Sequence, residues 1–364
     1  MSVEDKVVSS GAQVDAAAIR EQWDKLAQES PRLRAIDIAD RIGVSEAQLI
    51  ASRVGQWAQR LAPDRFADIL RGLPAVGEVM ALTRNEHVVH EKVGSYGHVT
   101  IQPGHAIVLN HHIDLRLFMG QWHHGFALTQ PLADGGVRQS LQFFDASGRA
   151  VHKVFARGET DMAAWSALVS RCVATEQSDT LGVKPLPALP ADLPDEQIDQ
   201  AGMHAHWSAM RDTHDFFGML RDFRVGRHQA MRLIGSEYAM PVANDAVRIM
   251  LEQAAASGLS IMCFVGNPGC IQIHTGPVAN IKMMGDWLNV MDPKFNLHLR
   301  TDRIATSWLV RKPTDDGVVT SLELFDEQQR QFVQFFGERK PGQKENAQWR
   351  ELAESLVDHA GAVQ

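Results

Sequence analysis

The feature that most constrains the fold of this chain is an internal duplication. The run GVRQSLQFFDASGRAVHKVF begins at Gly136, and GVVTSLELFDEQQRQFVQFF begins at Gly317, 181 residues later. Eight of the twenty aligned positions are identical, including Ser140 with Ser321. A repeat of this length indicates a duplicated domain rather than a short solenoid repeat. We therefore expect two copies of one structural unit.

A proline-rich segment separates the two copies. VKPLPALPADLPDE, residues 183–196, holds four prolines in fourteen residues, which favours a stiff and extended linker. We therefore divide the chain into a first repeat at 1–182, a linker at 183–199 and a second repeat at 200–364.

Each copy changes along its length from helical to strand-like patterns. Helices are predicted at 19–26, 35–42 and 45–54 in the first copy, with Ser45 as an N-cap, and at 200–223 and 227–238 in the second. Short alternating runs follow, such as CIQIHTG and VTSLELFD, and these predict antiparallel strands joined by hairpins. The expected class is α+β: two large antiparallel sheets that stack on one another, with helices at the N-terminal end of each repeat.

The amino-acid composition limits the classes of function that this chain is expected to have. The net charge of −8 does not favour a nucleic-acid binder, which usually presents a basic face. Three cysteines form neither a disulfide framework nor a zinc motif, and they fit a reducing cytoplasm. We found no secretory signal and no apolar run of membrane-spanning length, so a cytoplasmic protein is expected. Sixteen histidines are compatible with a metal or haem role.

Several long motifs identify a family. The chain resembles the HemS/ChuS-type hemin-transport and haem-degrading proteins over nearly its whole length, in order and at matching spacing. The matching motifs are TRNEHVVHEKVG from Thr83, DLRLF from Asp114, SLQFFD from Ser140, THDFF from Thr213, FVGNPGCIQIHTGP from Phe264 and RKPTDDGVVTSLELFD from Arg311.

The resemblance implies one haem (iron protoporphyrin IX) per chain, used in haem uptake, trafficking and iron acquisition. Two activities stay open, because a carrier and a haem-degrading oxygenase need the same binding residues. The implied partners are a haem oxygenase or an inner-membrane haem transporter. The partner, the electron donor, the product and the oligomeric state stay open at this point.

Among the histidines, His214 is the predicted axial ligand of the haem iron. It lies in WSAMRDTHDFFGML among apolar residues, and a neutral imidazole with one free nitrogen is a good iron donor. The family's proximal histidine falls in the matching H-x-F motif. The position 181 residues earlier is Leu33, so only the second copy offers this ligand.

Three cations are predicted to bind the haem propionates: Arg227, Lys312 and Arg339. Cations suit carboxylates through charge-assisted hydrogen bonds. Their counterparts in the first copy lack a positive charge and are Glu46, Gln130 and Gly158.

Four further residues carry predictions from the resemblance. Arg116 matches the arginine on the far face of the haem, where a guanidinium can hydrogen-bond water or O2, and it is the one catalytic candidate. Gln334 and Phe336 lie two apart on a strand, so they share a face, which the resemblance places against the haem. Whether His90 forms a second haem site stays open.

Two rival interpretations were weighed. Residues 35–54 resemble a helix-turn-helix, the basis for a nucleic-acid-binding alternative, but Glu46 near the start of the second helix would repel phosphate. No phosphate-binding loop, zinc-protease or serine-hydrolase motif stands in a convincing context. VGNPGC, which ends at Cys270, is interpreted as a hairpin turn with a core thiol.

Overall fold

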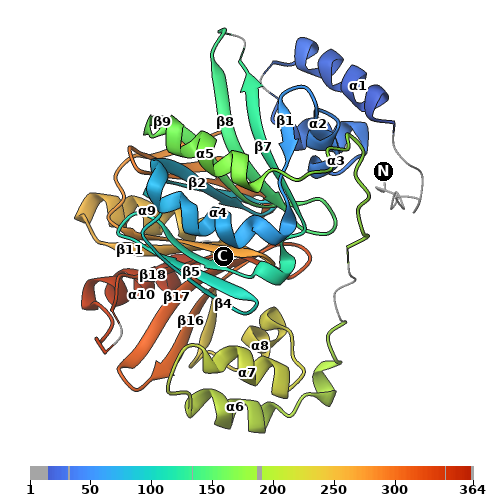
Figure 1. The fold of residues 1–364 in the computed structure, drawn as a ribbon. Helices are drawn as coiled ribbons and strands as arrows, with labels where there is room; N and C mark the ends of the chain where they lie inside the picture. Colours follow the sequence, from blue (N-terminus) through green and yellow to red (C-terminus); the bar gives the residue numbers. More distant parts are fainter. Residues whose placement is uncertain (1–14, 32, 133, 187–190, 341, 362–364) are drawn as a thin grey trace. The chain divides into compact units, whose positions relative to one another are not determined.

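The computed structural model describes residues 15–31, 33–132, 134–186, 191–340 and 342–361 (Figure 1). Its α-helices are α1 (Ala16–Glu29), α2 (Ala35–Ile42), α3 (Glu46–Ala51), α4 (Phe66–Gly72), α5 (Met162–Cys172), α6 (Gln200–Ser208), α7 (Asp215–Asp222), α8 (Arg227–Leu233), α9 (Ala246–Ser257) and α10 (Ala347–Gly361).

The first half of the chain contributes nine strands: β1 (Ala58–Arg60), β2 (Gly77–Arg84), β3 (Val88–Ser95), β4 (His98–Gln102), β5 (His105–Leu109), β6 (Asp114–Leu117), β7 (His124–Pro131), β8 (Val137–Phe144) and β9 (Ala150–Thr160).

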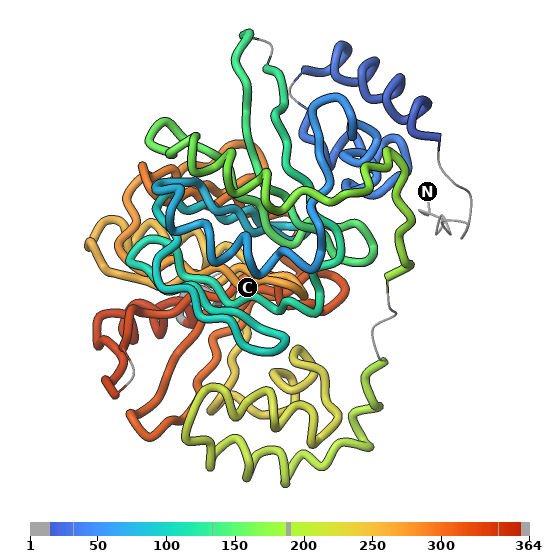
Figure 2. Tube along the Cα trace, in the orientation of Figure 1, coloured from blue at the N-terminus to red at the C-terminus, as the bar shows by residue number. Residues whose placement is uncertain are grey.

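The second half contributes the other nine: β10 (Ala239–Val242), β11 (Ile261–Asn267), β12 (Cys270–Gly276), β13 (Ile281–Met284), β14 (Trp287–Asp292), β15 (Phe295–Arg300), β16 (Thr306–Thr314), β17 (Gly317–Phe325) and β18 (Gln331–Gly337). Figure 2 follows the same chain as a trace.

These strands form two nine-stranded sheets. One has the order β1-β7-β8-β9-β2-β3-β15-β14-β13, and the other has the order β10-β16-β17-β18-β11-β12-β6-β5-β4. The predicted α+β class with two large antiparallel sheets is therefore confirmed.

Strand register confirms the duplication in three dimensions. Gln142 on β8 pairs with Lys153 on β9, and Glu323 on β17 pairs with Gln334 on β18. Both members of the second pair lie 181 residues after those of the first. The register also shifts at equivalent places, between Phe143 and Phe144 in one copy and between Leu324 and Phe325 in the other. A β-bulge kept at the same place is a feature of the common ancestor unit.

The chain forms two compact units, and the boundaries of these units differ from the boundaries of the two repeats. Unit 1 comprises Met1–Ala81, Ser95–Val108 and Leu117–Ala188, and unit 2 comprises Leu82–Gly94, Leu109–Arg116 and Leu189–Gln364. Two segments of the first repeat thus belong to unit 2. Periodicity could not predict this exchange, because it locates strands but not their non-local partners. Of the predicted linker, residues 187–190 lie outside the described residues.

Within unit 2, the sheet that contains β16, β17 and β18 has a different core on each face. Leu309, Leu322 and Phe335 point into a core that also holds Leu297 of β15, so strands of both sheets share it. Trp308 and Val310, on the opposite face, pack against helices α6, α7 and α8. This alternation along β16 is the period-two pattern of a strand buried on both sides.

The predicted helix at 200–223 is wrong as one continuous element. It is divided into α6 and α7, and His214 is the N-cap residue of α7 rather than a residue within a helix. The Asp215 carboxylate accepts the N–H groups of Arg211 and Asp212, and the Asp212 carboxylate accepts that of His214. Such side-chain bonds compete with the helical ladder and interrupt it.

The helix predicted at 227–238 is also shorter, because α8 stops at Leu233 and Gly235 adopts a φ of +94°. By contrast, α2 begins and ends as predicted, and Ser45 caps α3 through the N–H of Gln48.

In unit 1, α3 belongs to the core. Ala47, Leu49, Ile50 and Ala51 are buried together with Phe126 and Phe144 of the sheet. The second helix of the helix-turn-helix alternative is therefore a six-residue packing element, which leaves no exposed face to enter a DNA groove.

Candidate functional site

Three of the predicted site residues share one face of the sheet in unit 2, and a fourth reaches this face from helix α8. Glu323 lies opposite Gln334, and Ser321 lies opposite Phe336, across β17 and β18. Since side chains alternate along a strand, Gln334 and Phe336 do share a face, as predicted, and Lys312 of β16 reaches the same face. Arg227 is the first residue of helix α8, and its side chain binds Glu323 on this face.

A buried ion cluster forms where these elements meet. Arg227 donates from Nε and Nη2 to the two Glu323 carboxylate oxygens, both at 2.9 Å, and from Nη2 to Gln334 Oε1 at 3.2 Å. Lys312 Nζ donates to Glu323 Oε1 at 2.7 Å, and Ser321 Oγ donates to the same oxygen at 3.0 Å. Glu323 is the common acceptor of the cluster, and bidentate contact with arginine is the strong form of this interaction.

Burial and charge act in opposite directions on this cluster. Burial alone would raise the pKa of Glu323, but Arg227 and Lys312 more than offset it and lower the pKa to about 2. Burial lowers the pKa of Lys312; Glu323 opposes that shift, and Arg227 adds to it. With Glu323 ionised and both bases protonated, the cluster carries one net positive charge. That charge suits an incoming carboxylate.

Aromatic rings of α7 lie over the two bases. The Phe216 ring centroid is 4.7 Å from Lys312 Nζ and 5.0 Å from the Arg227 guanidinium carbon. Phe217 is 5.7 Å from that carbon, and 59% of its surface is exposed. An exposed aromatic ring therefore lies beside the Arg227 guanidinium.

His214 is the most accessible of the predicted residues. Its side chain is 90% exposed, and Nδ1 lies 2.5 Å from Asp212 Oδ1. The Asp212 carboxylate can accept a hydrogen bond from Nδ1–H, and in that tautomer Nε2 holds the lone pair that a metal ion needs. Metal-binding histidines usually have such a carboxylate partner, which sets the tautomer and the ring orientation.

Arg339 interacts electrostatically with Asp212, the carboxylate partner of His214. Its Nη2 lies 3.7 Å from Asp316 Oδ2, too long for a strong ion pair, and the guanidinium also helps to lower the pKa of Asp212. The first cause of that lowering is the backbone N–H of His214. The cation predicted for a propionate and the predicted iron ligand thus act on one carboxylate.

An aromatic surface extends from the cluster along the sheet. Phe336 and Phe264 are both partly exposed, and their ring centroids lie 5.2 Å apart in an edge-to-face contact. Phe264 pairs with Gln334 across β11 and β18. The ion cluster therefore borders apolar surface on its own face of the sheet.

Arg116 lies on β6, three strands from β18 in the order β18-β11-β12-β6. Its flanking residues Leu115 and Leu117 are fully buried, whereas Arg116 is 36% exposed and forms an ion pair with Asp114. Burial raises the pKa of Asp114, and Arg116 opposes that shift. Arg116 thus belongs to the partly exposed face of its strand, with a carboxylate that orients it.

His90 lies in a different environment. It is fully buried on β3, and neither ring nitrogen has a hydrogen-bond partner among the described residues. Burial lowers its pKa far below the usual value, and His274 and Lys92 lower it further. Lys92 Nζ in turn donates to His274 Nδ1 at 3.0 Å. His90 belongs to a polar group inside the core of unit 2, away from the exposed surface that carries His214.

The thiols are buried as well. All three cysteines are free, and burial raises the pKa of Cys270 to about 12. The Cys270 Sγ lies 3.2 Å from Thr83 Oγ1. Asn267 pairs with Cys270 across a tight turn, so the segment VGNPGC is the hairpin that the sequence predicted.

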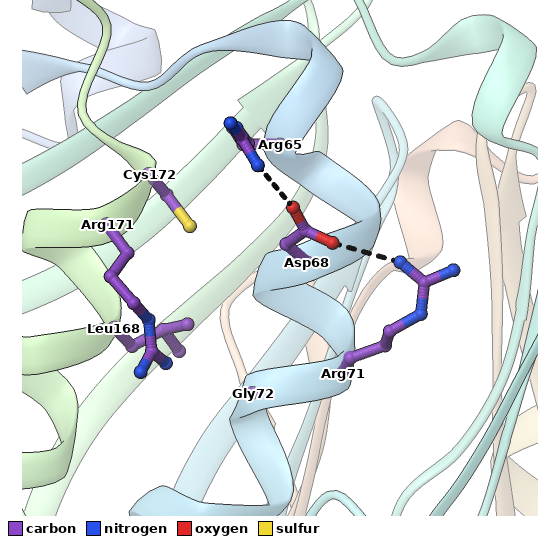
Figure 3. Close-up of a pocket in the computed structure, with 7 residues that line it drawn as sticks. All are labelled: Arg65, Asp68, Arg71, Gly72, Leu168, Arg171 and Cys172. Atoms are coloured by element: carbon purple, nitrogen blue, oxygen red, sulfur yellow. Dashed lines mark hydrogen bonds and ion pairs between the residues drawn. The ribbon is translucent and has the colours of Figure 1, made fainter.

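Two other groupings of polar side chains are already satisfied within the described residues. Glu86, His87 and Asp326 have the spacing of a metal site, but the Arg330 guanidinium contacts both carboxylates, at 2.5 and 2.8 Å. In unit 1, α4 and α5 border a hollow of about 300 Å³ (Figure 3). There Asp68 pairs with Arg65 at 3.1 Å and Arg71 at 3.0 Å, and none of the predicted site residues lines the hollow.

Among the residues of the site that were not predicted, Asp212 and Glu323 each left a signal in the sequence. Asp212 carries a local signal, a carboxylate two residues before the histidine, which was available from the sequence. Glu323 aligns with Gln142 of the first copy, so it shows the same difference in charge between the repeats that the three predicted cations show.

Comparison with known proteins decides the family. The family model described as the haemin-degrading HemS.ChuX domain matches residues 43–172 and 224–356, one match in each half. The chain belongs to this family. The curated HemS-type relative hemin transport protein HmuS of Yersinia pestis is 42% identical over 344 residues, covering 94% of this chain and 98% of that protein.

Two solved structures of similar proteins have the same fold as this chain. Holo-PhuS, a haem-binding protein from Pseudomonas aeruginosa, gives a TM-score of 0.92 at 48% identity over 94% of this chain and 99% of its own. ChuS, an E. coli haem oxygenase, gives 0.83 at 40% identity over 93% and 99%. Within the part of the chain that the structure describes, no helix is long and apolar enough to cross a membrane.

Proposed function

We propose that this chain binds haem for haem uptake and trafficking, with the iron held by His214. The observation that supports this most strongly is the His214–Asp212 pair, since it presents one exposed ring nitrogen whose partner nitrogen is fixed by a carboxylate. Relatives named as hemin transport and haem-binding proteins support the same function.

The surroundings of His214 fit the rest of a porphyrin. Propionates need cations, for which Arg227, Lys312 and Arg339 serve, and the ring needs apolar surface, for which Phe336 serves. Gln334 holds the Arg227 guanidinium at 3.2 Å and so helps to aim it. The first repeat has no histidine at the equivalent position, so we expect one haem per chain.

The test is the absorption spectrum of the protein mixed with hemin. The wild type should give a Soret band typical of histidine-ligated iron, and His214→Ala should lose or shift it. His204→Ala is the matched control, because His204 is an exposed histidine on the neighbouring helix α6. An unchanged spectrum in His214→Ala, with the control also unchanged, would remove the ligand assignment.

Haem degradation is the second candidate function, and Arg116 is the feature that favours it. A partly exposed guanidinium held by Asp114 can donate hydrogen bonds to water or O2 near a bound haem. A relative named as a haem oxygenase adds support. Ascorbate, added to the haem complex with catalase present, separates the two functions. Loss of the Soret band with a bile-pigment-like product favours the enzyme, and a stable band favours the carrier.

The location and partners belong to this proposal as well. Three free, buried thiols fit the reducing cytoplasm. A carrier there would exchange haem with a haem oxygenase or an inner-membrane haem transporter. Mixing the haem complex with a purified haem oxygenase tests the first of these, since transfer predicts decay of the donor's Soret band at a rate above spontaneous haem loss.

A further inference from the structure

The two repeats contain polar clusters at equivalent positions, with the charges rearranged. In unit 1, Lys153 Nζ donates to Glu46 Oε1 at 2.6 Å, and Gln142 donates to Ser140 Oγ at 3.0 Å. Counting 181 residues forward, Glu46 corresponds to Arg227, Lys153 to Gln334, and Gln142 to Glu323. The acid, the base and the amide have each moved to another position.

This rearrangement changes the net charge. The unit 1 cluster has one acid and one base, both less than a tenth exposed, so its charges cancel. The unit 2 cluster has two bases and one acid, because Lys312 stands where the first repeat has Gln130. Within the described residues, the second cluster therefore has an excess positive charge that can attract an anion.

We propose that Glu323 is the positioning residue of this anion site, holding Arg227 as the hydrogen-bond donor to one carboxylate and Lys312 beneath it as a second positive charge. This inference rests on the proposed function, because the carboxylate is taken to be a haem propionate. It adds a residue that does not touch the ligand and acts through the two bases.

The geometry supports a positioning role. Glu323 is completely buried, so it cannot meet an external ligand itself. Its two oxygens bind Arg227 in a bidentate manner, and Oε1 also holds Lys312, which fixes the distance between the two cations. Arg227 is 15% exposed, and its Nη1 makes no hydrogen bond within the described residues, so it can meet a ligand, whereas Lys312 is 4% exposed and adds its charge from beneath. Ordering the guanidinium beforehand lowers the entropic cost of binding.

Glu323 also keeps Lys312 charged. The charged groups that act on Lys312 are Glu323 from β17 and Arg227 from α8, while Phe216 of α7 covers it as a neutral ring. Without the carboxylate, burial and Arg227 would both favour the neutral amine. The site would then lose one positive charge at high pH.

The experiment compares haem with its dimethyl ester, which has the same iron and ring but no propionate charge. Both are titrated into wild type and Glu323→Gln in the same detergent buffer, from pH 6 to pH 9. The affinity for haem is divided by the affinity for the ester. Effects on iron ligation and on overall folding cancel in this ratio, because both ligands share them. For the wild type, we expect haem to bind better than the ester across most of this range.

For Glu323→Gln, we expect the haem-to-ester ratio to fall about tenfold at pH 8, as for one lost charge-assisted contact. We also expect the ratio to decline at a lower pH than in the wild type, because burial lowers the pKa of Lys312 and the variant lacks the carboxylate that opposes this shift. A ratio and a pH profile equal to those of the wild type would overturn the role of Glu323.

The matched control is Glu46→Gln, which removes the buried acid of the neutral cluster in unit 1. It should lower thermal stability but leave the ratio unchanged, and a fall equal to that of Glu323→Gln would show a merely structural effect. If Glu323→Gln does not fold, Glu323→Asp replaces it. The shorter acid cannot hold both bases at their present separation, so the ratio should fall, and an unchanged ratio contradicts the proposal.

Failure of the proposed function would be seen in the wild type itself, whereas failure of the role of Glu323 would be seen only in its variants. If wild type binds haem and its ester equally at every pH, the propionate role of the cations is wrong. If it gives no histidine-type Soret band, haem binding through His214 is wrong.

Discussion

At the residue scale, the chemistry of the candidate site rests on pairs of side chains. His214 is an exposed histidine, and its contact with Asp212 is of the kind that orients metal-binding histidines. Arg227 and Lys312 alone would be two buried repelling cations, and Glu323 makes them stable. The family motifs identified one member of each pair, and the hydrogen bonds in the structure identify its partner.

The buried acid predicts a pH dependence of stability. The folded-state pKa of Glu323, about 2, lies below its ordinary value of 4.5. A lowered acid pKa adds stability that is complete above the unfolded pKa and is lost as pH falls toward the folded pKa. The expected contribution is on the order of 3 kcal/mol, lost between about pH 4.5 and pH 2.

Urea unfolding of wild type and Glu323→Gln checks this. At pH 7 the variant should be less stable by about 3–5 kcal/mol, because two buried cations lose their partner. The gap should narrow as pH falls below about 4.5, since protonated Glu323 resembles glutamine. A gap that is constant with pH would show that Glu323 is not ionised in the folded protein.

Arg227 carries a second prediction at this scale. Arg227→Ala should weaken haem binding about 10- to 100-fold, the effect of losing a charge-assisted contact, while the Soret position stays unchanged because the propionates lie far from the iron. Arg232→Ala is the control, an exposed arginine on the same helix that pairs with Asp195. Equal weakening in both variants, measured by hemin titration, would remove the specific role of Arg227.

At the element scale, helix ends decide where the site residues stand. Capping residues made α2 and α3 predictable, since Gly43 and Ser45 separate them. The same reasoning missed the break between α6 and α7, because the interruption comes from Asp212 and Asp215 binding backbone N–H groups over a helix-compatible sequence. That break places His214 at a helix start, where it is exposed.

Close packing of α10 on the sheet gives an element-scale prediction. A Cβ added to Gly337 would lie 2.5 Å from Trp349 Cγ, and the Trp349 ring is fully buried with its Nε1–H donating to Thr320 O at 3.0 Å. Gly337→Ala should therefore destabilise the protein by about 1–3 kcal/mol.

Gly218→Ala is the matched control for this prediction. Gly218 lies inside α7, and the only neighbour of an added Cβ is an Arg221 nitrogen at 3.9 Å. This change should stabilise the protein by about 0.5–1 kcal/mol through helix propensity. Thermal unfolding of both variants decides it: a Gly337→Ala protein at least as stable as wild type would contradict the tight contact.

At the scale of the whole molecule, duplication followed by divergence explains the architecture. Equivalent registers and bulges in β8–β9 and β17–β18 show one ancestral unit, and the sequence predicted this from identical residues alone. The exchange of two first-repeat segments into unit 2 was not predictable, because pairing between distant strands leaves no local signal. The second copy carries His214 and the cluster of two bases and one acid, and we propose that haem binds there.

The most direct test of this account is a hemin titration of the wild type that measures stoichiometry at the Soret band, repeated on His214→Ala with and without free imidazole. The account predicts a break at one haem per chain, loss of the histidine-type band in the variant, and its return when imidazole supplies the missing ligand. A break at two haems per chain, or a histidine-type band that persists in His214→Ala without imidazole, would contradict it.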